Sequence, residues 1–280
     1  MNDTTDFDPA SVPVRPAATI MLIDDRPDLH VLMMRRNART VFAGGMWVFP
    51  GGRVDDDDRS PELLDACASS ELRWTDDGVN FADGAQAYWV ATARETFEEA
   101  GMLLARAGDE PIHAVDTPRW IEYRRALNAG EISFADIVAR ENLSLDTDSI
   151  HYIAHWVTPL GSPRRFSARF FLARTPPGQD PVQDHSETVR AQWVRPHDAI
   201  EAFERDEWTM MTPTVRMLES LGQFSRAGDA VAAASATRSG HTVRVVPRPD
   251  SDRYRIVLPG DPGYADGDPN IETGVIHLRP

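Results

Sequence analysis

The sequence predicts an α/β (α+β) fold in which helices cover a mixed sheet. Short apolar, β-prone runs alternate with amphipathic helical segments through the first 221 residues, and this alternation is typical of helices packed on a sheet. The 280 residues, of which 41% are hydrophobic, are enough to bury the core of one large domain. Beyond residue 222 the composition changes to alanine, serine and glycine, which predicts that this domain ends there.

The predicted elements follow one another along the main domain. Residues 17–23 and 30–34 predict a β-hairpin, because a turn-like segment separates two apolar runs. Residues 44–52 predict a strand that leads into a glycine-rich turn. Residues 85–104 predict a long helix, with Gly101 near its C-terminal end and an apolar stripe of Val90, Ala93, Phe97 and Ala100. Further helices are expected at 120–127, 134–140, 196–205 and 213–221, and further strands at 151–158, 165–173 and 189–194.

The chain divides into four segments. Residues 1–14 are expected to be a disordered tail, because their first part is acidic and polar and does not resemble a secretory signal. Residues 15–222 form the main domain. Residues 223–240 are either a linker or a terminal helix. Residues 241–280 form a C-terminal β-rich extension, with strands expected at 241–246 and 254–258.

Charge and cysteine usage limit the classes of function. The chain carries 29 basic and 44 acidic residues, a net charge of −15. Such a surface repels phosphate backbones, which argues against nucleic-acid binding, and a small anionic substrate would need local cations or arginines. The lone cysteine, Cys67, excludes an intramolecular disulfide and has no basic neighbour to form a thiolate. No apolar run is long enough to span a membrane, so we expect a cytoplasmic protein.

A cluster of carboxylates on the predicted helix carries the chemistry. Glu95, Glu98 and Glu99 are spaced i, i+3, i+4 and therefore share one helix face. Like charges one turn apart repel each other, and a divalent cation over them would remove the repulsion. Oxygen ligands of this kind suit Mg²⁺ or Mn²⁺. Arg94 stands four residues before Glu98, so that their ion pair would orient the carboxylates. The alternative interpretation is an acidic helix face in solvent.

Two segments together resemble a known motif. Arg94-Glu95-x-x-Glu98-Glu99-x-Gly101 resembles the second half of the Nudix box, and Phe49-Pro50-Gly51-Gly52-Arg53-Val54-Asp55 resembles the strand and glycine turn that open it. Glycines allow a tight turn, and their carbonyls can approach a metal. The resemblance implies catalytic roles for Glu98 and Arg94. The metal ligands that it implies are Glu95, Glu98, Glu99 and Gly52.

The box is interrupted in this sequence. Arg94 follows Gly52 by 42 positions, so about 28 residues, roughly 56–84, are inserted between the two halves. We expect the insertion to leave both halves close in space, since they serve the same ions. Counted back from Arg94, the position that usually holds a glutamate is Gln86. The interruption resembles the Nudix subfamily that includes a peroxisomal coenzyme A diphosphatase, and the similarity extends over residues 17–221, through 124–134, 155–159, 163–166 and 169–171.

Outside the box, one glutamate and several arginines are candidates for the site. Glu187 lies in a loop where the family often has a glutamate that binds metal or positions the attacking water; the alternative is a plain loop carboxylate. Arg164, Arg165 and Arg169 could clamp phosphates, because guanidinium forks suit phosphate oxygens. The alternative is ion pairing on an acidic surface. Further candidates of the same kind are Arg35, Arg36 and Arg39.

Two other groups are interpreted as structural. The acidic run 55–58 is expected to be the solvated start of the insertion rather than a second metal site. His151 and His155 alternate with apolar residues on a predicted strand, and no set of cysteine and histidine ligands accompanies them. They are expected to be packed or surface histidines rather than zinc ligands.

The resemblance implies a Nudix α/β/α sandwich with a mixed sheet, a helical insertion inside the box and a short C-terminal β-rich extension. It implies Mg²⁺- or Mn²⁺-dependent hydrolysis of a diphosphate linkage in a nucleotide derivative, with coenzyme A or an acyl-coenzyme A as the expected substrate. ADP-ribose, NADH or a nucleotide sugar is the alternative substrate. A non-catalytic nucleotide-binding regulatory module is the alternative from another class, which the intact carboxylate set disfavours. A homodimer stays open, since the strand-like tail could pair across an interface.

Overall fold

A nine-stranded mixed sheet forms the centre of the computed structural model, which describes residues 11–38, 43–67, 84–182, 188–236, 240–248, 251–267 and 274–280. In order across the sheet the strands are β10 (Thr188–Val194), β2 (Leu29–Arg36), β1 (Val14–Asp25), β9 (Arg165–Arg174), β8 (His151–Val157), β14 (Gly274–Ile276) and β11 (His241–Thr242). Two short strands, β3 (Trp47–Val48) and β4 (Gly51–Arg53), pair with β2 and β1.

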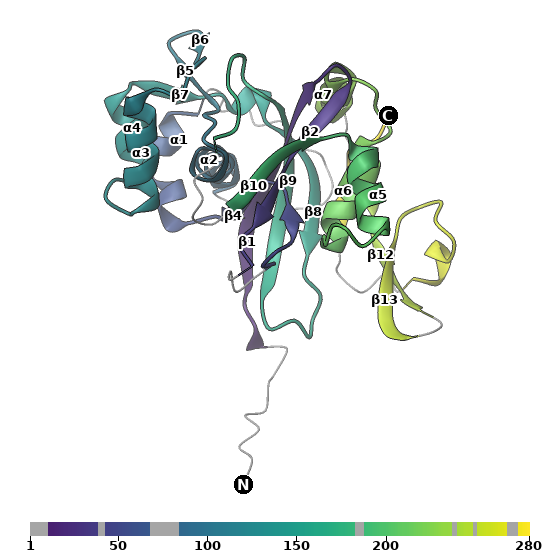
Figure 1. Cartoon of the computed structure of the whole chain (residues 1–280). Helices are drawn as coiled ribbons and strands as arrows, with labels where there is room; N and C mark the ends of the chain where they lie inside the picture. The colour runs from purple at the N-terminus through teal and green to yellow at the C-terminus, as the bar shows by residue number, and fades with distance from the viewer. Residues whose placement is uncertain are drawn as a thin grey trace.

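Helices cover both faces of this sheet. On one side lie α1 (Pro61–Asp65), α2 (Gln86–Glu95), α3 (Pro118–Asn128) and α4 (Phe134–Arg140), and on the other α5 (Pro196–Glu204), α6 (Thr212–Leu221) and α7 (Ala227–Ala236) (Figure 1). The three layers confirm the predicted α/β/α sandwich with a mixed sheet. Apart from the segments 44–52 and 85–104, the elements predicted in the main domain end within a few residues of the observed ones.

Parts of several predictions lie outside the described residues. These parts are residues 1–10 of the expected tail, residues 68–83 of the insertion, and the candidates Arg39 and Glu187. The described part of the insertion contains a 3₁₀ turn, Asp56–Arg59, and the short helix α1. No helix in the described part of the chain is both long and apolar enough to cross a membrane.

The glycine turn lies where two central strands separate. Near their shared turn β1 and β2 pair directly, with Ile23 opposite Val31. Farther along, β4 pairs with β1 and β3 pairs with β2, so the short Phe49-Pro50 connection fits between the two strands. The amide of Ile20 donates to the carbonyl of Pro50 at 2.9 Å. The predicted strand 44–52 is therefore two short strands, and Gly51 and Gly52 begin the second one, where β1 and β2 no longer pair with each other.

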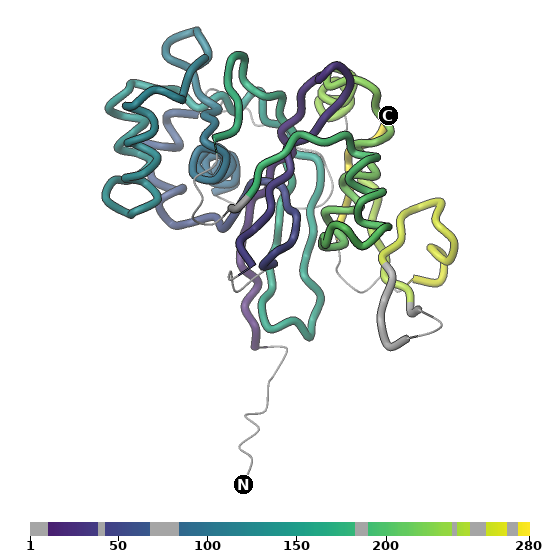
Figure 2. Tube along the Cα trace, viewed as in Figure 1, coloured from purple at the N-terminus to yellow at the C-terminus, as the bar shows by residue number. Residues whose placement is uncertain are grey.

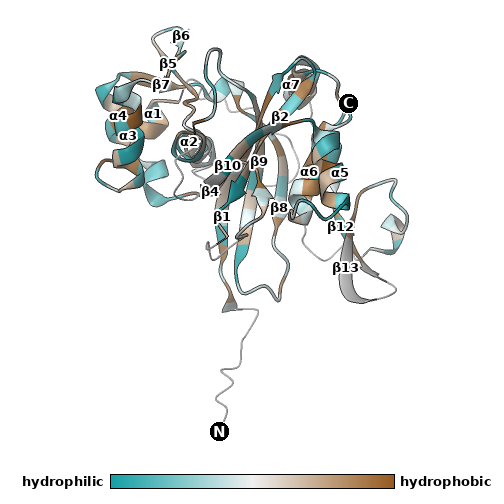
Figure 3. Cartoon of the chain, viewed as in Figure 1, coloured by the Kyte–Doolittle hydropathy of each residue, from teal (hydrophilic) through white to brown (hydrophobic). Residues whose placement is uncertain are grey.

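Both faces of the sheet are buried. Side chains alternate between the faces of a strand, and along β1 Ile20 and Leu22 join the core under α2, whereas Met21 and Ile23 join the core under α6 and α7. Figure 3 shows hydrophobic residues along the central strands and hydrophilic ones on the outer sides of the flanking helices. Burial on both faces fixes the register, because a shift by one residue would exchange the two faces.

The box helix is shorter than the predicted 85–104. It runs as α2 to Glu95, continues through a single π-helical segment, Thr96–Ala100, and ends at Gly101. Gly101 has a φ of 67°, the left-handed conformation that terminates many helices. Residues 102–104 therefore leave the helix, although all three are buried. The predicted apolar stripe lies entirely in the core beside the sheet, at exposures of 0 or 1%.

The C-terminal region contributes to the same sheet. Of the two alternatives for 223–240, the structure has a helix, α7, whose small residues Ala227, Ala230 and Ala234 pack against the core. The unpredicted strand β14 pairs with β8, and β11 pairs with β14. A second hairpin, β12 (Arg244–Arg248) and β13 (Ser251–Val257), lies beside α6 (Figure 2). The described strands of the C-terminal extension thus have pairing partners in the same chain.

Candidate active site

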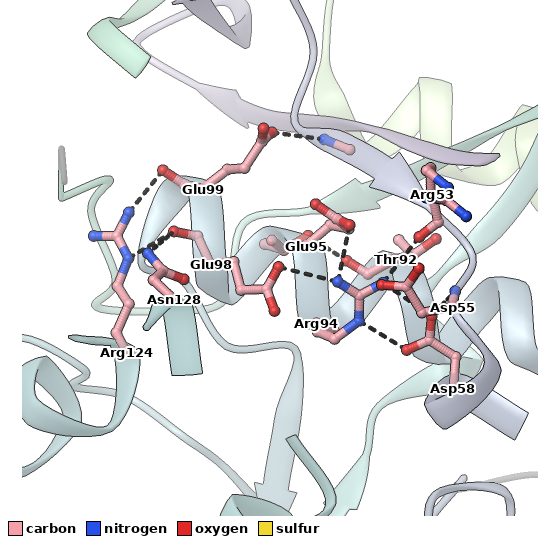
Figure 4. Close-up of polar contacts among 12 residues, drawn as sticks. Arg53, Asp55, Asp58, Thr92, Arg94, Glu95, Glu98, Glu99, Arg124 and Asn128 are labelled. Carbon is pink, nitrogen blue, oxygen red and sulfur yellow. Dashed lines mark hydrogen bonds and ion pairs between the residues drawn. The ribbon is translucent and has the colours of Figure 1, made fainter. Parts of the chain in front are cut away.

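The two halves of the interrupted box meet in space. The amide of Gly51 donates to the Glu99 carboxylate at 2.9 Å. At Gly52 an added Cβ would lie 2.4 Å from a carboxylate oxygen of Glu95, so a side chain there would displace that carboxylate. The insertion thus leaves the glycine turn in contact with the box helix, as the sequence predicts. Figure 4 shows the carboxylates of the helix beside this turn.

A single guanidinium orders the acidic side chains. Arg94 is 8% exposed. Its Nη1 donates to Glu95 at 2.9 Å and to Glu98 at 3.0 Å, and its Nη2 donates to the carbonyl of Arg53 at 2.9 Å. Nε and Nη2 also form a two-point contact with Asp58, at 2.8 and 2.9 Å. The expected ion pair between Arg94 and Glu98 is present, and all five N–H donors of Arg94 are used.

Asp58 is a site residue that the sequence analysis missed. Its side chain is fully buried, and besides Arg94 it accepts the amide of Asp55 at 2.8 Å. The interpretation of the run 55–58 as solvated is therefore wrong for Asp58, although Asp55, Asp56 and Asp57 are exposed. Counting forward from Gly52 by the same box spacing, instead of backward from Arg94, identifies Asp58 rather than Gln86. The insertion follows the acidic position of the box and does not precede it.

Glu99 points to a different set of partners. Besides the amide of Gly51, it contacts Arg36, whose Nη1 lies 3.3 Å from Oε1 of Glu99. Glu99 is 7% exposed and the Arg36 side chain 20%. Arg36 is the last residue of β2, so this contact joins the sheet to the box helix. Of the two further arginine candidates that the structure describes, Arg35 and Arg36, it is Arg36 that contacts a carboxylate of the box helix.

The electrostatics of the cluster favour a bound cation. Burial raises the pKa of Glu95 well above its usual value, and the neighbouring charges of Glu99 and Glu98 raise it further, while Arg94 opposes the shift. Burial also raises the pKa of Glu98. Five carboxylates pair with two guanidiniums, which leaves an excess of negative charge. The five are Asp55, Asp58, Glu95, Glu98 and Glu99, and the two are Arg94 and Arg36.

These residues fit a hard divalent cation in donor type and in charge. Carboxylate oxygens are the ligands that Mg²⁺ and Mn²⁺ prefer. In the described residues, however, no three acidic, histidine or cysteine side chains converge on one point as a ready set of metal ligands. Glu95 and Glu98 turn towards Arg94, and Glu99 turns towards Gly51 and Arg36. Binding of one ion by all three would require the Glu99 carboxylate to turn towards Glu95 and Glu98.

The three arginines predicted to bind phosphate lie along β9 and the hairpin before it. Arg169 is 7% exposed, and its guanidinium lies 4.7 Å from the ring of Tyr88 and 6.0 Å from that of Tyr152. Ala18 pairs with both Arg169 and Gly52, so Arg169 stands two strands from the glycine turn, roughly 10 Å away.

Arg164 and Arg165 lie farther from the box. Arg165 precedes Arg169 by four residues, about 13 Å along the strand, and donates to the carbonyl of Thr158 at 3.0 Å. Arg164 is exposed. The structure does not bring this pair to the carboxylates. Glu187 lies outside the described residues, but its neighbour Thr188 is the register partner of Arg36.

The other candidate ligands are structural in the described residues. His155 is buried, and its Nε2 lies 2.8 Å from the hydroxyl of Ser167, which confirms a packed histidine. Burial raises the pKa of the Cys67 thiol to about 11, so Cys67 is protonated at neutral pH and is no nucleophile.

Comparison with known proteins points to one family. The family model described as the NUDT19 Nudix domain matches residues 73–221. Acyl-coenzyme A diphosphatase NUDT19 from Gallus gallus is 27% identical over 304 residues, which cover 90% of this chain and 80% of that protein. The Homo sapiens protein of the same name is 28% identical over 235 residues, covering 71% of this chain and 62% of that protein. The chain thus spans less than two thirds of the human protein.

A solved structure shares the fold. The crystal structure of a NUDIX hydrolase from Alicyclobacillus acidocaldarius superposes with a TM-score of 0.68 at 26% identity, covering 79% of this chain and 97% of that one. The overlap takes in most of the described chain.

Proposed function

The chain belongs to the NUDT19 Nudix domain family of hydrolases, and we propose that it hydrolyses the diphosphate linkage of coenzyme A or an acyl-coenzyme A with the help of Mg²⁺ or Mn²⁺. The substrate is proposed from the names of the chicken and human relatives. The reaction type is supported by the carboxylate cluster, because acidic side chains of this kind suit a cation that activates water.

One observation carries the proposal: the interrupted box closes. An insertion separates Gly51 from Glu99 in sequence, yet the amide of Gly51 donates to the Glu99 carboxylate at 2.9 Å. A regulatory module that binds a nucleotide without cleaving it would have no use for buried carboxylates that repel one another. The cost of keeping Glu95 buried and Glu98 partly buried is best explained by a cation that they bind during turnover.

Glu95, Glu98 and Glu99, with the carbonyl of Gly52, would hold the metal. When bound, such a cation neutralises charge on the phosphates and lowers the pKa of a water molecule. Arg94 is a positioning residue in this proposal, because its five donors are occupied by protein acceptors. It holds Glu95 and Glu98 on one side of the glycine turn.

Arg36 and Glu187 are proposed to act on substrate and water. Arg36 lies 3.3 Å from Glu99, and its side chain is 20% exposed, so that a substrate could reach it. A guanidinium in this position can exchange the carboxylate for a phosphate oxygen of the substrate. Glu187 would accept the proton of the attacking water, since the next residue, Thr188, pairs with Arg36 at this end of the sheet. Among the three predicted arginines, Arg169 is the nearest to the turn.

The proposed reaction balances without a covalent enzyme intermediate. Water adds its oxygen to one phosphorus of the diphosphate, the bridging P–O bond breaks, and the other phosphate leaves with the bond electrons. From coenzyme A the products are adenosine 3′,5′-bisphosphate and phosphopantetheine. Two further proposals concern the protein as a whole: that it works in the cytoplasm, and that it forms a homodimer, which light scattering of the purified chain would test.

One substrate panel tests the function. Coenzyme A, an acyl-coenzyme A, NADH, ADP-ribose, a nucleotide sugar and a dinucleoside polyphosphate are compared by kcat/KM, with Mg²⁺, with Mn²⁺ and with EDTA. We expect the coenzyme A compounds to rank first and EDTA to abolish turnover. Coenzyme A compounds that rank tenfold or more below ADP-ribose or NADH would contradict the substrate but not the reaction type. Absence of metal-dependent turnover on every compound would contradict both.

A further inference from the structure

An arginine from α3 holds the C-terminal end of the box helix. The last carbonyls of a helix have no partner within it, and two of them here belong to Glu98 and Glu99, the candidate metal ligands. The guanidinium of Arg124 reaches both: Nε donates to the carbonyl of Glu98 at 2.9 Å and Nη2 to that of Glu99 at 2.7 Å. Arg124 is 7% exposed. Figure 4 shows it beside the backbone of these residues.

The same guanidinium contacts a third segment. Its Nη1 donates to the carbonyl of Val182, and the amide of Val182 donates to the carbonyl of Ala100 at 2.9 Å. Val182 stands five residues before the candidate water-binding Glu187. Arg124 therefore joins the end of the helix that bears the carboxylates to the start of the segment that leads to Glu187.

The contact is tightly packed. A Cβ at Gly101 would lie 2.7 Å from Nη1 of Arg124 and 3.2 Å from the side chain of Val182. A cation at this position also offsets the partial negative charge of the helix end. A lysine cannot reproduce the arrangement, because one ammonium on a flexible stem does not match a planar fork that spans three carbonyls.

We propose that Arg124 is a positioning residue for hydrolysis. It fixes the peptide groups of Glu98 and Glu99 relative to α3 and to Val182, and so sets where the carboxylates of these two candidate metal ligands stand. The inference rests on the proposed function for the roles of these glutamates. In this proposal Arg124 touches neither the metal nor the substrate. It acts by holding in place the glutamates that bind the metal.

The test compares Arg124→Lys and Arg124→Gln with the control Arg125→Gln in the full chain. Arg125 is the next residue of α3, but it is exposed and pairs with Glu122 and Glu131. The Kd for Mn²⁺ is measured from the EPR signal of free Mn²⁺ without substrate, and kcat and KM are measured with coenzyme A. We expect both Arg124 variants to bind Mn²⁺ about tenfold more weakly and to lose kcat about tenfold or more, as outer-shell substitutions do. KM should be nearly constant, and the control should match the wild type.

The outcomes separate this inference from the proposed function. Arg124 variants with wild-type Mn²⁺ affinity and kcat, and a lower Tm alone, would show a purely structural arginine and overturn it. If Arg124→Lys does not fold, Arg124→Gln, which keeps a donor, decides by the same measurements. A wild-type protein that binds Mn²⁺ but cleaves no coenzyme A compound would refute the proposed substrate, while the Mn²⁺ affinities would still decide the role of Arg124.

Discussion

The box helix and the β8–β9 hairpin carry similar sequence signals, namely charged side chains that suggest metal or phosphate binding, yet only one of them forms a cluster. Around the helix, Arg94 contacts Asp58, Glu95 and Glu98 within 3.0 Å. At the hairpin, Arg165 donates to a backbone carbonyl and Arg164 is exposed. The two regions differ in the partners that surround their charged side chains. The backbone places several carboxylates around Arg94, whereas it places a backbone carbonyl beside Arg165.

Helix geometry brings Glu95 and Glu98 to one side, because residues three apart lie on one face, and Arg94 contacts both. Glu99 follows in the π-helical segment and turns to Gly51 and Arg36. No such rule connects a strand residue to a distant site, since its neighbours depend on the register of the adjacent strands. Charge spacing therefore predicts a site well within one helix, and poorly across a sheet. Substitutions around the box helix are therefore expected to affect activity or stability more than those in the β8–β9 hairpin.

Glu99→Gln should have the largest effect. We expect kcat to fall by at least about a hundredfold, because the variant loses a charged metal ligand, with the melting temperature nearly unchanged, since the amide oxygen can still accept from Gly51. The measurements are steady-state kinetics with Mg²⁺ and thermal unfolding. Full magnesium-dependent activity in this variant would show that Glu99 is not a metal ligand. It would contradict the conclusion that all three glutamates of the box helix belong to the site.

Asp58→Ala should change stability more than any exposed substitution in the same turn. The substitution leaves two buried N–H donors of Arg94 without an acceptor, although Glu95 and Glu98 still offset its charge. We expect a cost of about 1–3 kcal/mol and a Tm lower by roughly 2–12 °C. We also expect a loss of kcat, because Arg94 would no longer be fixed. The matched control is Asp57→Ala, whose side chain is exposed. Equal Tm values for the two variants would show that the Asp58 contact is not formed in solution.

Arg36→Ala should act on substrate binding. The loss of one charge-assisted hydrogen bond to a phosphate, roughly 1.5 kcal/mol, raises KM for coenzyme A about tenfold. Arg35→Ala is the control, because Arg35 is the neighbouring residue and points to the opposite face of β2. If both variants raise KM equally, the effect is one of net charge, and Arg36 does not contact the substrate.

Arg164→Ala and Arg165→Ala should have the smallest effects. Both side chains lie about 13 Å or more along the sheet from the row of the glycine turn, so we expect KM and kcat to stay within about twofold of the wild type, as for surface substitutions. A tenfold rise in KM for either variant would place the hairpin at the substrate. The box helix and the β8–β9 hairpin would then both contribute to the active site, contrary to what the structure indicates.

The sequence predicts most of the fold because apolar periodicity specifies each element locally. Helix 134–140 and strand 165–173 are examples, matched by α4 and β9. It misses β14, a three-residue strand that forms only because β8 offers an unpaired edge. It also extends the box helix through residues 102–104, since these are apolar, and gives too little weight to the left-handed Gly101 that ends the helix.

The sequence likewise predicts part of the site but not all of it. The carboxylate triad and the proximity of Gly52 follow from the motif. Asp58 was missed because a run of four aspartates suggests solvent, and nothing in its composition shows that one of the four is fully buried. Arg36 could not be preferred over Arg35 without the register of β2, which decides that Arg36 faces the box helix.

The central claim is that the interrupted box closes into one metal site, and anomalous diffraction from crystals soaked in MnCl₂ tests it most directly. The account predicts a manganese peak within about 2.5 Å of carboxylate oxygens of Glu95, Glu98 or Glu99 and beside the carbonyl of Gly52, with Arg36 turned away from Glu99. A peak held instead by the exposed aspartates of residues 55–57, with none at the box helix, would contradict it.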